Sequence, residues 1–78
     1  MNQICISYDL RNKNSSHYSK IYQQLRNYDS QRIQLSMWLL NTPKTAEEVI
    51  TDFRHCVDMN DRFAAFSVNN DLLNILKE

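Results

Sequence analysis

The segment Ile4-Cys5-Ile6-Ser7-Tyr8-Asp9 decides the fold, together with the segment Arg32-Ile33-Gln34-Leu35-Ser36-Met37-Trp38. In the first segment the large apolar residues occupy alternate positions, and this period of two predicts a strand with one strongly apolar face. Asp9 places a carboxylate at the C-terminal end of this strand. The second segment also alternates, but its apolar run continues to Leu40 and is long for one strand. A bend near Leu35-Ser36 is expected to divide it into two adjacent strands.

Two other segments have helical spacing. Ser16 is a plausible N-cap for a helix that runs to about Tyr28, with apolar residues three and four positions apart. The second helix starts after Thr45, because Thr45 and Glu48 have the spacing of a capping box, and it closes near residue 58. The stretch from Arg62 to Val68 then predicts the last strand.

The predicted order is therefore β-α-β-β-α-β in a single domain, residues 1–78, followed by a short helical tail that Asp71 caps. The natural packing of this order is an α+β architecture in which two helices cover one face of an antiparallel sheet. The other face is expected to expose Cys5 and Ser7, together with Trp38 or Leu40. A half-apolar sheet face commonly marks a protein contact, and we expect it to pair with a second copy in a homodimer.

Composition excludes several classes of site. The nine basic and nine acidic residues give no net charge, whereas a dedicated nucleic-acid binder usually has a basic excess. The chain contains no glycine, so phosphate-cradling loops and dinucleotide fingerprints are not expected, and no cofactor is predicted. Cys5 and Cys56 lack metal-ligand spacing and suit buried free thiols in a cytoplasmic protein. No segment approaches the length of a membrane span.

Three stretches of the chain resemble the small ferredoxin-like proteins that include the CRISPR adaptation subunit, VapD-type toxins and the SinR-like proteins. The matching residues are Ser7-Tyr8-Asp9, the hairpin segment 32–38, and the apolar strand after Asn60-Asp61. Leu39 and Leu40 look most like the SinR-like branch. The resemblance covers most of residues 3–68 and implies the ferredoxin-like fold.

The resemblance also implies a candidate activity. In that family the acidic residue that ends the first strand lies near a two-fold axis, and some members are described as metal-dependent nucleases that use it. If this family role applies to the present chain, the Asp9 side chains of two protomers would bind one Mg²⁺ and position a water molecule against a phosphodiester. An aspartate at a strand end also commonly caps the following loop, which is the alternative role for Asp9.

Three functions remain open from the sequence. The first is a non-enzymatic, dimeric interaction module with a protein partner, such as an accessory or anti-defence protein of a mobile element. Its contact residues would be Trp38, Leu40 and Ser7, although Trp38 suits the core equally if its indole N–H finds an acceptor. The second is a Mg²⁺-dependent nuclease in which Asp9 is the catalytic and metal-binding residue. The third is nucleic-acid binding without cleavage, through Arg11, Lys13, Lys20 and Arg32.

Overall fold

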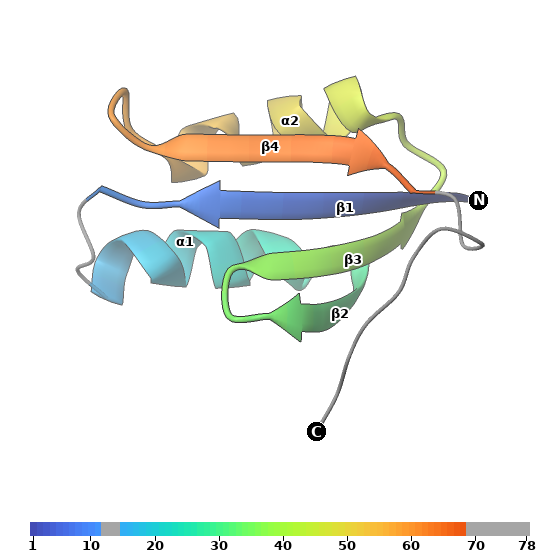
Figure 1. Cartoon of the computed structure of the whole chain (residues 1–78), viewed down its shortest axis with the longest axis horizontal. Coiled ribbons are helices and arrows are strands. Elements are labelled where there is room, and N and C mark those ends of the chain that lie inside the picture. Colours follow the sequence, from blue (N-terminus) through green and yellow to red (C-terminus); the bar gives the residue numbers. More distant parts are fainter. Residues whose placement is uncertain (12–14, 69–78) are drawn as a thin grey trace.

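The chain folds as a four-stranded sheet with two helices packed on one of its faces (Figure 1). The computed structural model describes residues 1–11 and 15–68, so Lys13 and the predicted helical tail lie outside the described residues. Neither described helix has the length and hydropathy to cross a membrane. The elements are β1 (Asn2–Asp9), α1 (Ser15–Leu25), β2 (Asp29–Gln34), β3 (Met37–Thr42), α2 (Ala46–Phe53), the 3₁₀ turn η1 (Arg54–Cys56) and β4 (Arg62–Ser67).

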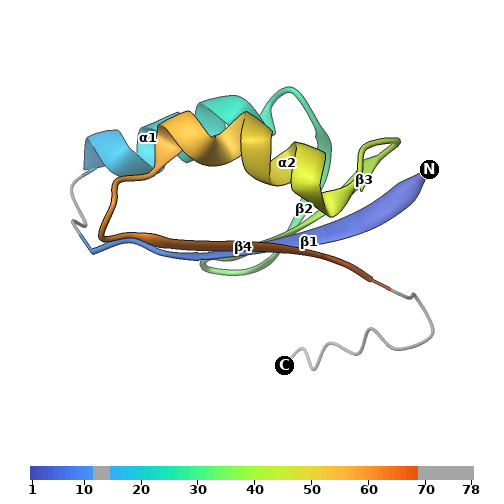
Figure 2. The same cartoon turned by 90° about the horizontal axis from the view of Figure 1, so that it is seen from above.

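The strands lie in the order β2-β3-β1-β4, and every neighbouring pair is antiparallel. Seen from the side, α1 and α2 lie next to each other over the same face of the sheet (Figure 2). This arrangement confirms the predicted ferredoxin-like α+β fold. It also confirms the bend in the long apolar run, because a turn at Leu35-Ser36 separates β2 from β3.

Successive side chains of the central strand β1 point to opposite faces of the sheet. Ile4, Ile6 and Tyr8 point to the helices and are at most 5% exposed. They meet Phe53 of α2, which is fully buried, and the other apolar residues of the same layer, which are Ile21, Leu25, Leu40 and Val49. The opposite face, which carries Gln3, is called the helix-free face below.

Aromatic rings concentrate on the helix side of the sheet. Seven of the eight aromatic residues form one continuous network, in which neighbouring ring centroids are 5.1 to 6.5 Å apart. Such separations are those of favourable aromatic pairs. The eighth ring, Phe66, pairs in register with Cys5 and so lies on the helix-free face. In order, the network runs Tyr28, Phe53, Phe63, Tyr8, Tyr18, Tyr22, Trp38.

Local signals placed the start of α2 better than the end of α1. The Thr45 hydroxyl accepts from the Glu48 N–H at 3.2 Å, and the Glu48 carboxylate accepts from the Thr45 N–H at 3.0 Å, which confirms the capping box. The first helix ends at Leu25 rather than near Tyr28, and β2 already begins at Asp29, where a turn was expected. Pairing with β3 outweighs the weak strand preference of the polar residues that open β2, because Asp29 faces Asn41 in the register.

Candidate functional site

The predicted catalytic residue, Asp9, is the last residue of β1 and its side chain is exposed. Across the sheet its register partner is Arg62, the first residue of β4. These residues, with Ser7 and Asp61, line an open hollow of about 510 Å³ at the end of the strand pair. The structure therefore places Asp9 where solvent and a substrate can reach it.

A second carboxylate, that of Asp61, organises this end of the sheet. One of its oxygens accepts from the backbone N–H of Arg11 at 2.7 Å, and the other accepts from the N–H of Asp58 at 2.8 Å. These bonds tie the chain that leaves β1 to the loop that enters β4. The sequence marked Asn60-Asp61 only as a turn, because nothing local indicates a bond to a residue fifty positions away.

Among the described residues, the donors at this edge do not by themselves form a metal-binding group. Within the described part of the chain no group of three or more histidine, cysteine, aspartate or glutamate side chains could hold an ion. Both Asp61 oxygens accept backbone hydrogen bonds, so Asp9 supplies the accessible carboxylate of one protomer. Mg²⁺ accepts a site with few carboxylates because it keeps several waters, so it would fit here only if the Asp9 carboxylate of a second copy came to the same place.

Two of the predicted interaction residues were assigned to the wrong face. Leu40 is fully buried in the core rather than exposed on the helix-free face. Trp38 pairs in register with Ile6 and is half-buried on the helix side, where its indole N–H donates to the Tyr8 hydroxyl at 3.1 Å. The alternative that put Trp38 in the core with a hydrogen-bond acceptor is therefore the one observed. Ser7 does lie on the helix-free face, opposite Met37 and Ala64.

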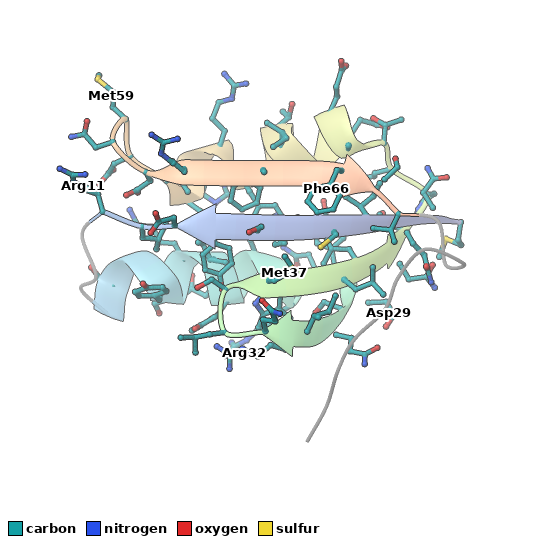
Figure 3. The ribbon with its side chains drawn as sticks, in the orientation of Figure 1. Arg11, Asp29, Arg32, Met37, Met59 and Phe66 are labelled. Carbon is teal, nitrogen blue, oxygen red and sulfur yellow. The ribbon has the colours of Figure 1, made fainter. Side chains whose placement is uncertain are left out.

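The predicted nucleic-acid residues do not converge on one surface. The backbone carbonyl of Lys20 contacts the thiol of Cys56, which places Lys20 beside η1. Arg32 instead contacts Tyr22 on the other flank of α1, and Arg11 lies beyond the end of β1 (Figure 3). Arg11, Lys20 and Arg32 therefore do not form one basic patch, and Lys13 lies outside the described residues.

The helix-free face carries a row of apolar residues across β3, β1 and β4. Phe66 is 45% exposed there and stands opposite Cys5, with Leu39 on the other side of Cys5 (Figure 3). Burial raises the pKa of the Cys5 thiol, so this thiol is not a ready nucleophile. On the same face the side-chain oxygen of Gln3 is buried and has no hydrogen-bond partner among the described residues. An exposed aromatic ring in an apolar row on a sheet face is typical of a surface that another chain covers.

Outside these surfaces, one ionised cluster joins two connections of the fold to the helix α2. The Asp52 carboxylate of α2 accepts from both the Lys44 ammonium and the Tyr28 hydroxyl, and the ammonium lies 5.4 Å from the centre of the Tyr28 ring. These hydrogen bonds, that from Lys44 first, lower the pKa of Asp52. Burial, followed by the bond to Asp52, raises the pKa of Tyr28, so its hydroxyl remains a donor at neutral pH.

The Asp52 cluster predicts a pH-dependent contribution to stability. Because the pKa of Asp52 is lowered in the folded state, its contribution is present above the unfolded pKa of about 3.9 and is lost as the pH falls through the folded value. We expect Asp52→Asn to reduce the free energy of unfolding at pH 7, and the difference from the wild type to shrink towards pH 3. Urea unfolding at both pH values measures it, and an equal difference at both would contradict the assignment.

Comparisons with known proteins agree with this fold. The family model described as CRISPR associated protein Cas2 matches residues 1–74 of the chain. Among solved structures, the chain is similar to the crystal structure of a hypothetical protein, TT1823, from Thermus thermophilus. The two sequences are 19% identical, the match covers 99% of this chain and 92% of the other, and the TM-score is 0.74. At this level of identity the likeness shows a shared fold.

Proposed function

The chain belongs to the family of CRISPR-associated Cas2 proteins, and from that premise we propose that it acts as a non-enzymatic homodimer that binds a protein partner. Membership indicates a CRISPR-related role. The observation that carries the dimer is the exposed Phe66 ring, which lies on the edge strand β4 of the helix-free face. In this proposal the same face of a second copy covers Phe66 and Leu39.

Symmetry amplifies the contribution of one ring. Burying the exposed part of a phenylalanine contributes on the order of 1 kcal/mol, and an isologous interface contains each residue twice. A charged replacement acts twice for the same reason, because it removes two rings and brings two like charges to the interface. Phe66 is therefore the position at which one substitution tests the interface most sharply.

We expect Phe66→Arg to weaken dimerisation by at least about 100-fold. Size-exclusion chromatography with multi-angle light scattering, over micromolar concentrations, measures the mass of the wild type and the variant. Met59→Arg is the matched control, because it adds the same charge to a side chain that is 98% exposed in the loop before β4. A monomeric wild type, or a Phe66→Arg variant that stays dimeric, would overturn the proposed interface.

A second candidate function is cleavage of RNA or DNA. It is supported by the exposed Asp9 carboxylate at the rim of the hollow beside β1 and β4. A Mg²⁺ ion bound there would polarise a phosphate oxygen and lower the pKa of a bound water. The residues of this chain would contribute the two Asp9 carboxylates that hold the ion, while Asp61 fixes the loops on either side.

A further inference from the structure

Arg32 is held against two aromatic rings at the edge of the sheet. Its guanidinium carbon lies 5.4 Å from the centre of the Trp38 ring and 5.9 Å from that of Tyr22. Its Nη2 group donates to the Tyr22 hydroxyl at 3.2 Å and to the Leu35 carbonyl at 3.0 Å. These contacts fix the guanidinium in place before any ligand arrives. We call Tyr22, Arg32 and Trp38 the Arg32 cluster.

The cluster retains unused binding capacity. The two bonds of Arg32 both use Nη2, so the Nε and Nη1 donors of the guanidinium fork are still available. Within the described residues, no carboxylate pairs with Arg32. The Arg32 side chain is exposed, and Tyr22 is 36% exposed. A fixed arginine fork beside an accessible ring suits a planar group that carries a phosphate.

The charges of the neutral chain are segregated along the sequence. Between Asp9 and Asp29 the sequence has four basic residues and no acidic one. Between Thr45 and Asp61, in contrast, it has four acidic residues against the single arginine Arg54. The first of these segments contains α1, which lies on the β3 side of the sheet, whereas α2 lies beside β4 (Figure 1). Around the cluster itself, the exposed Arg32 guanidinium, which has no carboxylate partner among the described residues, favours an anionic ligand.

We propose that the Arg32 cluster binds single-stranded nucleic acid. An unpaired base packs against the exposed Tyr22 ring, and the free edge of the Arg32 guanidinium binds an adjacent phosphate. A single strand fits better than a duplex because stacking on a side chain requires an accessible base face. The row of rings behind Tyr22, which runs through Tyr18 into the core, gives the site a rigid support.

This inference is independent of the dimer. Arg32 pairs in register with Trp38, which faces the helices, whereas Phe66 lies on the helix-free face. A Phe66→Arg variant that no longer dimerises should therefore still bind a single strand, so failure of one proposal is distinguishable from failure of the other.

The test is a titration of the whole chain with labelled single-stranded RNA and DNA of about 12 nucleotides, within the range of single-strand binding sites. Anisotropy of the label gives the affinity. The emission of Trp38, the only tryptophan, reports whether the ligand reaches the cluster. We expect Trp38 emission to change on binding, and a duplex of the same sequence to bind at least about 10-fold more weakly, because its bases are stacked inside.

Substitutions separate stacking from charge. Tyr22→Ser should weaken single-strand binding by about 5- to 100-fold, whereas Tyr22→Phe, which keeps the ring, should stay within about twofold. Arg32→Gln should weaken it by about 10-fold and reduce the slope of log affinity against log salt by about one. Arg54→Gln, on the exposed η1 turn, removes the same charge away from the cluster and serves as the matched control.

Three outcomes would overturn the proposal. The first is a Tyr22→Ser variant that binds as tightly as the wild type. The second is an equal loss of affinity in Arg32→Gln and Arg54→Gln, which indicates only general attraction of charge. The third is a chain that binds neither RNA nor DNA but whose Trp38 emission responds to an acidic peptide, which indicates a protein ligand. Circular dichroism of each variant confirms that the fold is retained.

Discussion

Replacing Phe53 with alanine is expected to remove most of the stability of the fold. Phe53 is fully buried, and its ring lies between those of Phe63 and Tyr28, with centroids 5.1 and 5.8 Å away. Truncating a buried phenylalanine typically costs about 3–5 kcal/mol, because apolar area is lost and a cavity remains. A domain of this length has a free energy of unfolding of only about 4–12 kcal/mol. The loss also interrupts the aromatic network between α2 and β4.

Urea unfolding followed by far-ultraviolet circular dichroism measures this effect. The protein concentration must be the same for every variant, because dimerisation would otherwise change the apparent stability. Phe53→Leu keeps part of the volume and should lose clearly less than Phe53→Ala. Met59→Ala, at a side chain that is 98% exposed, should stay within about 0.5 kcal/mol of the wild type. A Phe53→Ala variant as stable as Met59→Ala would show that Phe53 is not central to the core.

The second large effect concerns catalysis. Any Mg²⁺-dependent cleavage of labelled RNA or DNA by this chain should fall by at least about 100-fold in Asp9→Asn, because the substitution removes the charge of a direct metal ligand. The amide has nearly the shape of the carboxylate, and Asp9 is exposed, so the fold should be retained.

Asp29→Asn provides the matched control, because Asp29 is also an exposed aspartate, at the start of β2. Its cleavage rate should equal that of the wild type. Cleavage that persists undiminished in Asp9→Asn would remove Asp9 as the catalytic residue and point to a contaminating enzyme. A wild type that cleaves neither nucleic acid with Mg²⁺ or Mn²⁺ would leave the non-enzymatic dimer as the function.

The misplacement of Trp38 and Leu40 shows where the sequence pattern failed. In the run from Met37 to Leu40 both alternating sets are apolar, so period-two alternation cannot decide which set faces the helices. The pairing of β1 with β3 decides which set faces the helices. Ile6 is opposite Trp38 and Ile4 is opposite Leu40, and both isoleucines already point to the core. Met37 and Leu39, which the pattern would equally allow inside, lie on the helix-free face instead.

The sequence by itself determined the elements whose signals are local. The alternation in β1, the capping box of Thr45 and Glu48, and the bend at Leu35-Ser36 each depend on residues within a few positions of one another. Short-range hydrogen bonds and side-chain periodicity are sufficient for such features. The order of these elements then leaves one natural packing, which is the ferredoxin-like fold.

Only the tertiary structure decided the contacts between distant residues. It joined Asp61 to Arg11, placed Lys20 and Arg32 on opposite flanks of α1, and brought Arg32 against Tyr22 and Trp38. None of these pairs has a signal in the sequence, because each depends on strand register and on how a helix lies across the sheet. Register is set by burial of a whole face, so a side chain gains its neighbours only after the core has formed.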